Sequence, residues 1–201
     1  MIWISVMTWN ALYLSLQKKI DMKKIFTLFA FILTTILFSQ DLQYEEVVKV
    51  DSVTTKDELY NRARTWTSQV FNSKNNLITT EDKQAGEISG IGYYDYRADK
   101  KYKGSSCVEG PLTYKFSIFL KDGRYKYLFH SFDHKGSRGN ICNRIDYGRL
   151  TLTEEAPEKG RGIAYNYGWE DVKYKTKLKV EGLVAELKEA MIKKYEGSND
   201  W

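Results

Sequence analysis

The sequence predicts an α+β fold: an antiparallel sheet of four to six strands with two helices packed on one face, in the order β-α-β-β-β-β-α. A run of aromatic and β-branched residues from Thr113 to Phe132 is interrupted by Asp122-Gly123, which is the pattern of a β-hairpin. Two other segments, one on each side of this run, carry apolar residues at helical spacing. Because the hairpin has one apolar face, both helices are expected on that face.

The Asp122-Gly123 pair sets the register of the predicted hairpin. Asp-Gly readily adopts the two positive φ angles of a two-residue type I′ turn, so Lys121 should face Arg124, and pairing should continue outward from there. One face then consists of Tyr114, Phe116, Ile118, Leu120, Tyr125, Tyr127 and Phe129, and the other carries Lys115, Ser117, Lys126 and His130 among a few apolar residues. The first face is the predicted floor of the core.

A strand and a helix are predicted before the hairpin. Residues 44–50 have a β-rich composition, with Val48 and Val50 on one side. Thr55 and Glu58 fit a capping box, in which each side chain bonds to the other residue's backbone N–H. Leu59, Ala63, Trp66 and Val70 follow at spacings of four, three and four. This spacing forms one helical stripe, so the helix should bury one side.

Two further strands are expected over residues 77–80 and 87–96, joined by a turn. In the second strand Ile88, Gly90, Gly92 and Tyr94 share a face. Glycine weakens a strand, and two glycines on one face indicate that a backbone or a bulky ring comes close. We expect Trp66 to lie over them; the alternative is that the glycines mark a β-bulge.

Beyond the hairpin, residues 134–147 are predicted to be irregular, residues 148–153 to contain a short strand, and residues 154–168 to form a loop. The terminal segment is helical by pattern, with an apolar stripe of Val180, Leu183, Val184, Leu187, Met191 and Tyr195. Its start should fall between Trp169 and Lys177, and Gly197 should end it. Gly182 costs this helix about 1 kcal/mol relative to alanine, so either the packing is tight there or the helix bends.

Length and charge limit the class of protein. With 201 residues, of which 42% are hydrophobic, the chain is long enough for one domain with a core. Without the residues before Gln40, the basic count falls from 31 to 27 and the acidic count from 26 to 25, so the formal charge falls from +5 to about +2. Because this charge is small and dispersed, we expect no nucleic-acid partner.

Residues 22–39 are predicted to be a secretory signal peptide. Two lysines precede an apolar run from Ile25 to Phe38, and the small residue Ser39 comes before polar Gln40. Fourteen helical residues span about 21 Å, which is short of a hydrocarbon core of about 30 Å. An uncleaved membrane anchor is the alternative.

Residues 1–21 resemble neither a domain nor an ordinary leader, and we interpret them as an upstream translation artefact or an extended leader. Residues 40–201 would then form a single exported α+β domain, periplasmic or extracellular, with no membrane span after signal cleavage.

The two cysteines are predicted to form a bridge. In an exported protein a cysteine pair is more often a disulfide than a metal site, and no histidine spacing here suits zinc. Extending the hairpin register outward places Cys107 opposite position 138, a few residues from Cys142. We therefore predict a Cys107–Cys142 disulfide; the alternative is two unrelated thiols.

The residues His130, Asp133 and His134 are the candidates for chemistry. On a regular strand the two histidines point the same way but lie about 13 Å apart at 3.3 Å per residue, which is too far to share a metal ion. Two surface histidines near the end of a hairpin are the simpler interpretation, since nothing specifies a nucleophile or an orienting partner. We predict no catalytic residue, metal or cofactor, with a hydrolase site at these three residues as the alternative.

Tyr93, Tyr94 and Tyr96, followed by Arg97, are candidates for stacking against a sugar or a peptide, because aromatic rings with polar tips suit such ligands. Tyrosine is also a good strand former, so the alternative is a structural role.

Three segments resemble a known family: YEEVVKVDSVTTKDELYNRARTWTSQVF, the acidic turn EDKQAG leading into EISGIG, and KDGRYKY at the hairpin. They are similar to the domain-of-unknown-function family 4468, which has a TBP-like fold and occurs mainly in exported proteins of Bacteroidota. The resemblance covers Tyr44 to Phe132 well and the terminal helix loosely. It implies a TBP-like fold and carries over no catalytic residues, because no activity is assigned to the family, and the fold label does not imply DNA binding.

We therefore predict an exported, single-domain protein of the bacterial envelope that binds an unknown ligand or envelope protein, or serves a structural role, without catalysis. In a hydrolase, His130, Asp133 and His134 should converge in a cleft, whereas in a binding module they should be dispersed and an aromatic groove should lie elsewhere. A lipid carrier would need space between sheet and helices that Trp66 and Phe129 do not leave.

Overall fold

The computed structural model describes residues 40–98, 102, 104–137, 143–157 and 163–193. The leader, Cys142, Tyr195 and Gly197 lie outside these residues. Contacts gather the chain from Gln40 onward into one compact unit.

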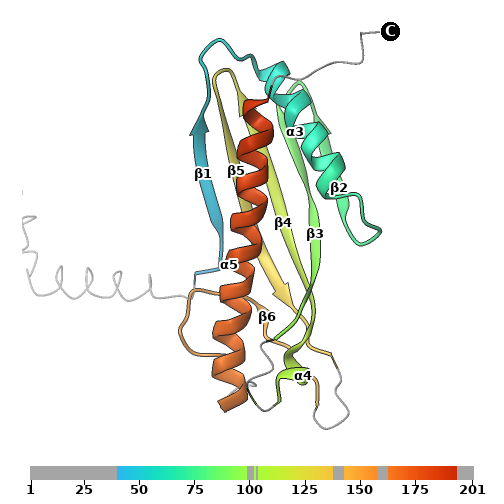
Figure 1. The fold of residues 1–201 in the computed structure, drawn as a ribbon, viewed down its shortest axis with the longest axis vertical. Helices are drawn as coiled ribbons and strands as arrows, with labels where there is room; N and C mark the ends of the chain where they lie inside the picture. Colours follow the sequence, from blue (N-terminus) through green and yellow to red (C-terminus); the bar gives the residue numbers. More distant parts are fainter. Residues whose placement is uncertain (1–39, 99–101, 103, 138–142, 158–162, 194–201) are drawn as a thin grey trace, which may run out of the picture. The chain divides into compact units, whose positions relative to one another are not determined.

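This unit is built on a six-stranded antiparallel sheet (Figure 1). The strands are β1 (Tyr44–Lys49), β2 (Leu77–Asp82), β3 (Glu87–Tyr96), β4 (Gly110–Lys121), β5 (Arg124–His134) and β6 (Gly148–Arg149). Their order across the sheet is β1-β5-β4-β3-β2, and the short β6 pairs with the end of β5. The predicted hairpin, β4–β5, is therefore at the centre, and β1 and β2 lie at the edges.

Two long helices cover one face of the sheet, as the apolar face of the hairpin requires. Helix α3 (Lys56–Val70) packs against β3 and β4. Helix α5 (Ile163–Ile192) lies over the hairpin, between β1 on one side and α3 on the other (Figure 1). The predicted α+β fold is confirmed. One helical turn, α4 (Ser105–Val108), lies in the connection before β4.

The β4–β5 hairpin has the predicted register. Lys121 faces Arg124, Leu120 faces Tyr125, Ile118 faces Tyr127 and Phe116 faces Phe129, and the whole apolar face is buried. The turn is not type I′, because only Gly123 of the central pair has a positive φ, of 67°. The loop before α3 holds this turn: the Asp122 carboxylate accepts a bond from the Lys56 N–H at 2.7 Å, and the Gly123 N–H donates to the Thr54 carbonyl at 2.9 Å.

Helix α3 begins at the predicted cap and buries the predicted stripe. The Thr55 hydroxyl accepts a bond from the Glu58 N–H at 3.2 Å. Leu59, Ala63 and Trp66 are buried, and Val70 is half-buried. Beyond the helix, the ring of Phe71 stacks on Phe116 with centroids 4.1 Å apart, and the ring of Trp66 meets Phe71 edge-on at 5.5 Å. These rings attach α3 to the centre of the hairpin.

A β-bulge at Ser131 interrupts the hairpin. The pairing shifts by one residue between Thr113 and Lys115, so that Ser131 and Phe132 together oppose Tyr114. Ser131 has a φ of 57°, in the left-handed region that non-glycine residues rarely adopt. Before the bulge, the odd-numbered side chains of β5 point into the core. Because of the extra residue, the even-numbered side chains point into the core beyond it.

The glycines of β3 lie beneath rings of β4. A Cβ at Gly90 would lie 2.7 Å from the Phe116 ring, and a Cβ at Gly92 would lie 2.3 Å from the Tyr114 ring. The prediction that Trp66 covers these glycines is therefore wrong, although the underlying argument that a bulky ring comes close holds. A bulge is present as well, but it lies in the neighbouring strand β2, beside the position that pairs with Gly90.

Helix α5 begins earlier than predicted. It starts at Ile163, inside the segment expected to be a loop. Gly168 is placed where a Cβ would lie 2.5 Å from the Tyr147 hydroxyl, so this glycine lets the tyrosine approach the helix backbone. The buried stripe consists of Trp169, Val172, Thr176, Val180, Leu183, Leu187 and Met191. It contains the predicted Val180, Leu183, Leu187 and Met191, whereas the predicted Val184 is half-buried at its flank.

Gly182 is not explained by tight packing, since it is exposed and a Cβ there would meet nothing within 4 Å. Gly182→Ala should raise the free energy of unfolding by about 0.5–1 kcal/mol, because alanine favours the helix and restricts the unfolded chain. Gly92→Ala should instead lower it by about 1–3 kcal/mol, because the added methyl overlaps the Tyr114 ring. Urea unfolding followed by circular dichroism measures both, and a loss of stability in Gly182→Ala would contradict this packing.

Candidate functional site

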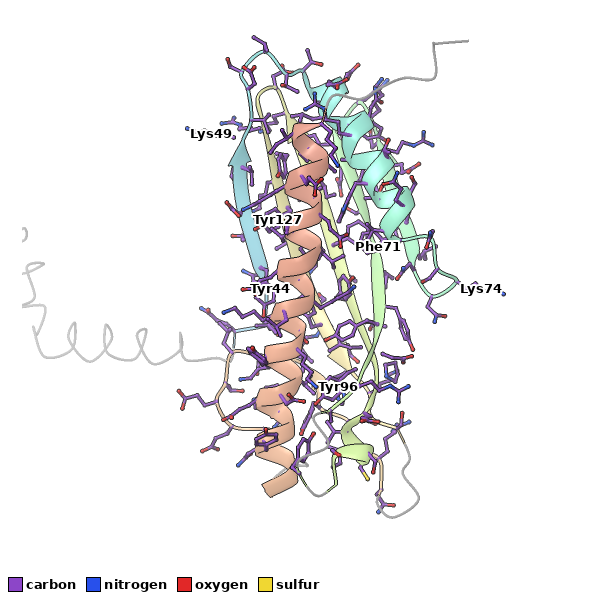
Figure 2. All side chains as sticks on the ribbon, in the orientation of Figure 1. Tyr44, Lys49, Phe71, Lys74, Tyr96 and Tyr127 are labelled. Carbon is purple, nitrogen blue, oxygen red and sulfur yellow. The ribbon has the colours of Figure 1, made fainter. Side chains whose placement is uncertain are left out.

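Two hollows lie along the gap between the edge strand β1 and helix α5. One, of about 600 Å³, opens near the start of β1, and the other, of about 480 Å³, opens near its end. The walls of the first include Tyr44, Tyr127, Val180 and Val184, and those of the second include Val48, Tyr125, Met191 and Ile192. Lys188 lines both hollows. We call the two together the β1–α5 groove; Figure 2 shows Tyr44 and Tyr127 on the side of α5 that faces β1.

The groove exists because α5 covers the hairpin and leaves the neighbouring strand open. The buried stripe of the helix points onto β4 and β5, so its flank, which carries Val184 and Lys188, faces β1. On β1 itself, Tyr44 and Val48 are only half-buried. A concave surface with apolar walls and a few polar groups is the usual form of a ligand site.

An ion pair crosses the groove between the two hollows. Lys188 Nζ lies 2.7 Å from Glu46 Oε2, and the Tyr127 hydroxyl donates to the same oxygen at 2.7 Å. Both bonds lower the pKa of Glu46, so the carboxylate is ionised at neutral pH. The two charged side chains are 40% and 46% exposed, and an ion pair at such exposure contributes little to stability because water screens its charges. The pair can open at little cost, which would join the two hollows.

A buried hydroxyl lies at the second hollow. Tyr125 is 1% exposed, and its hydroxyl has no hydrogen-bond partner within the described part of the chain. Burial and the nearby charge of Glu46 raise the pKa of Tyr125 to about 12, so the group remains a neutral donor. Arg62 lines the same hollow and donates to the Met191 carbonyl at 2.6 Å. The groove therefore offers apolar contact and hydrogen bonds rather than a reactive group.

The three candidates for chemistry do not converge. Because of the Ser131 bulge, His130 points to the open face of the sheet and His134 points into the core. His130 Nδ1 lies 2.9 Å from the Ser131 hydroxyl, and Asp133 is on the open face. Within the described residues, no group of three or more His, Cys, Asp or Glu side chains could hold a metal ion. The alternative of a hydrolase site at His130, Asp133 and His134 has no geometric basis.

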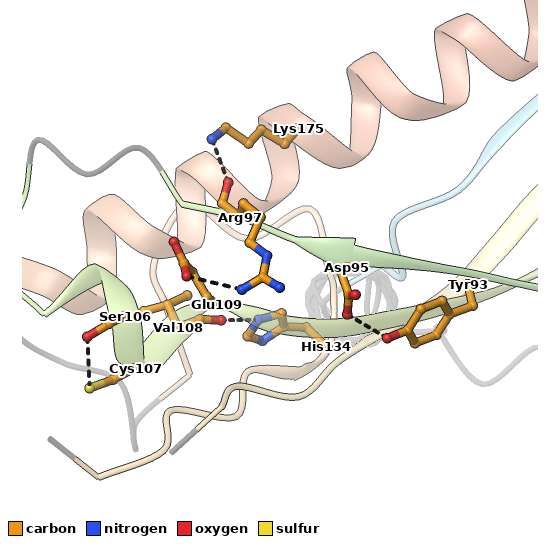
Figure 3. A network of polar contacts seen from close by, with 9 residues as sticks. All are labelled: Tyr93, Asp95, Arg97, Ser106, Cys107, Val108, Glu109, His134 and Lys175. Atoms are coloured by element: carbon orange, nitrogen blue, oxygen red, sulfur yellow. Dashed lines mark hydrogen bonds and ion pairs between the residues drawn. The ribbon is translucent and has the colours of Figure 1, made fainter. Parts of the chain in front are cut away.

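His134 is a buried structural residue, so the expectation of a surface histidine is wrong at this position. Its Nε2 lies 2.7 Å from the Val108 carbonyl oxygen (Figure 3), and the Tyr147 N–H lies 3.4 Å from its Nδ1. A carbonyl only accepts and an amide N–H only donates, so the ring is the neutral tautomer with its proton on Nε2. Burial lowers the pKa of His134. The ring thereby fastens α4 and the segment before β6 to the end of β5.

The three tyrosines of β3 do not form one stacking surface. Tyr93 lies on the open face, where its hydroxyl donates to Asp95 at 2.5 Å (Figure 3). The hydroxyls of Tyr94 and Tyr96 bond instead to Thr176 and Asp171 of α5. Burial raises the pKa of both buried tyrosines. Their structural role, which the sequence left as the alternative, is to anchor α5 on the sheet.

Of the two cysteines in the predicted disulfide, the structure describes Cys107. Cys107 lies in α4 and is fully buried, whereas Cys142 lies outside the described residues. The Ile145 N–H donates to the Cys107 carbonyl at 3.0 Å. The chain three residues after Cys142 therefore runs directly beside Cys107, and the bridge stays a prediction.

No pattern in the sequence predicts the groove. Tyr125 and Tyr127 belong to the face predicted for the core, and the two residues of the ion pair, Glu46 and Lys188, are 142 positions apart. One signal could have found the site: Glu46 shares a side of its strand with Tyr44 and Val48. A carboxylate on the half-buried side of a strand needs a charged or hydrogen-bonding partner.

Comparison with known proteins relates this architecture to a protein family. Residues 44–135 match the family model described as a domain of unknown function (DUF4468) with TBP-like fold. This part of the chain is a DUF4468 domain. It runs from β1 to the end of β5 and includes one wall of the groove, so the resemblance seen in the sequence is confirmed.

Two crystal structures share the fold of the DUF4468 domain with its terminal helix. A TBP-like protein from Parabacteroides distasonis has a TM-score of 0.60 and 15% sequence identity, covering 77% of this chain and 95% of its own. A DUF4468 family protein from Bacteroides ovatus has a TM-score of 0.54 and 11% identity, covering 75% of this chain and 86% of its own. A search of curated proteins finds no significant match. At these identities the likeness shows the fold alone.

The buried neutral His134 makes the stability of the DUF4468 domain depend on pH. Its folded pKa lies below the unfolded value of about 6.5. Its contribution is therefore complete above about pH 6.5 and is lost as the pH falls, at no more than about 1.4 kcal/mol per pH unit. In His134→Gln, the free energy of unfolding should fall much less between pH 7.5 and pH 5.5 than it does in the wild-type protein. Urea unfolding at both pH values measures this difference.

The matched control is His130→Gln, which changes the half-buried histidine on the open face. Burial also lowers the pKa of His130, but the His130 ring is half-buried whereas that of His134 is fully buried, so this variant should keep more of the wild-type pH dependence than His134→Gln. An unchanged pH dependence in His134→Gln would show that His134 is not held neutral by the fold.

Proposed function

We propose that this protein is an exported, non-catalytic binding protein of the bacterial envelope, and that its ligand lies in the β1–α5 groove. The observation that carries the proposal is the pair of hollows of about 600 and 480 Å³ that meet at the exposed ion pair of Lys188 and Glu46. An elongated ligand that displaced Lys188 would contact both hollows at once.

The walls indicate a partly apolar ligand with at least one hydrogen-bond acceptor. Val180 and Val184 line the first hollow, and Val48, Met191 and Ile192 line the second. The Tyr125 hydroxyl supplies a donor that has no partner among the described residues. An unsatisfied buried hydroxyl costs about 1–3 kcal/mol, so a ligand acceptor that reached it would gain affinity.

The site lies at the flank of α5. Trp66 and Phe129 are buried in the layer between the sheet and the helices, where their side chains occupy space that an enclosed lipid would need. We therefore favour a groove ligand over an enclosed lipid. No reactive constellation accompanies the groove in the described residues, which supports binding without catalysis.

Export is supported by the sequence of the leader. Residues 22–39 combine two lysines, an apolar run and a small residue before Gln40. Of the helices that the structure describes, none is long and apolar enough to cross a membrane. In an oxidising compartment, a Cys107–Cys142 disulfide would tie α4 to the segment before β6.

Native mass spectrometry of the full chain, expressed in a Bacteroides host and recovered from the periplasm, tests the proposal. We expect a mature chain beginning near Gln40, two hydrogens lighter than the reduced chain, with a bound small molecule. Ala185→Trp should abolish that complex, because Ala185 lines the first hollow and an indole would fill it. Ala85→Trp changes an exposed alanine in the turn between β2 and β3 and should keep the complex.

The results of this experiment test export, the disulfide, ligand binding and the position of the ligand separately. An unprocessed chain confined to the cytosol would overturn export, and two free thiols would overturn the bridge. A mature chain that carries no small molecule would overturn the binding function in favour of a structural role. A complex that survives Ala185→Trp would show that the ligand binds outside the groove.

A further inference from the structure

The open face of the sheet carries three cations on one cross-strand row. Lys49 of β1 pairs with Arg124 of β5, and Arg124 pairs with Lys121 of β4. All three residues are exposed, and the alternation along each strand puts them on the face opposite the helices. Neighbouring strands lie about 4.8 Å apart, so the backbones of the three residues fall within about 10 Å.

The cations of this basic row form no ion pair. None of the three side chains has an acidic partner within ion-pair distance among the residues that the structure describes. The nearby carboxylates bond to other groups: Asp122 accepts from the Lys56 N–H, Asp51 from the Val53 N–H, Glu87 from the Ser89 hydroxyl, and Glu45 pairs with Lys126 at 2.6 Å. Like charges directly opposite one another destabilise a sheet, so an anion bound here would relieve the repulsion.

An apolar floor lies on the next row of the same face. Val47 and Phe119 both pair with Lys126, and they are 57% and 37% exposed. With Lys121, Arg124 and Lys126 they line a hollow of about 410 Å³. We call this hollow the basic hollow; it lies on the face opposite the β1–α5 groove.

We propose that the basic hollow binds a single-chain amphiphile that ends in a phosphate monoester. The phosphate would lie over Lys121 and Arg124, and the first part of the alkyl or acyl chain would cover Val47 and Phe119. A phosphate monoester carries about −1.5 to −2 charges at neutral pH, which matches the two unpaired cations of the hollow, Lys121 and Arg124, better than a single carboxylate does. The arginine fork also suits phosphate oxygens.

Isothermal titration calorimetry with dodecyl phosphate, below its micelle concentration, tests this site on the purified protein. We expect binding at least tenfold tighter than that of inorganic phosphate or of dodecyl maltoside, because head and tail each contribute. Lys121→Ala combined with Arg124→Ala should weaken binding at least tenfold. Phe119→Asn should weaken the binding of dodecyl phosphate and leave the binding of inorganic phosphate unchanged.

The matched control is Lys115→Ala, which removes an exposed lysine of the same face outside the hollow. It should keep the wild-type affinity. Equal binding of inorganic phosphate would reduce the site to a simple anion site, and equal binding of dodecyl maltoside would reduce it to detergent adsorption; either result overturns the proposal. Should a variant fail to fold, the wild-type protein still decides, because affinity for dodecyl phosphate must fall with added salt.

Discussion

The structure depends on burial of the aromatic face of the β4–β5 hairpin. Its members are the largest side chains of the central strands, and Phe116, Phe129 and Tyr125 are at most 1% exposed. Burying a side chain of this size stabilises the fold by about 1.5–3 kcal/mol. A two-stranded hairpin cannot bury such a face by itself, so α3 and α5 must both pack on the same side.

The two candidate binding surfaces follow from that constraint. Because α5 lies over β4 and β5, edge strand β1 is left with Tyr44 and Val48 half-buried, and the β1–α5 groove opens beside the helix. Because both helices occupy one face, the other face remains open to solvent, and Lys121 and Arg124 of its charged row line the basic hollow. The buried His134 at the end of the hairpin contacts the Val108 carbonyl and the Tyr147 N–H, and so fastens the neighbouring loops to β5.

Much of the fold could be predicted because local signals agree with it. Asp122-Gly123 fixed the hairpin register, and the Thr55 cap fixed the start of α3. The predictions are wrong where contacts between residues far apart in the sequence determine the local structure. The Ser131 bulge, which no local pattern announces, reversed the direction of His134. Residues 154–168 were expected to form a loop, yet α5 begins at Ile163, and Gly168 within it accommodates the Tyr147 hydroxyl. The groove required knowing that Lys188 reaches Glu46, which no periodicity encodes.

Native-state hydrogen exchange tests the central claim most directly, because it reports the stability of each strand separately. If the aromatic face of the hairpin holds the fold together, the amides of β4 and β5 between Lys115 and Phe129 should exchange slowest. Their opening free energy should equal the free energy of global unfolding, and the outer amides of β1 should exchange through smaller openings. Equal or greater protection of β1, or opening of the hairpin while α3 and α5 stay protected, would contradict the account.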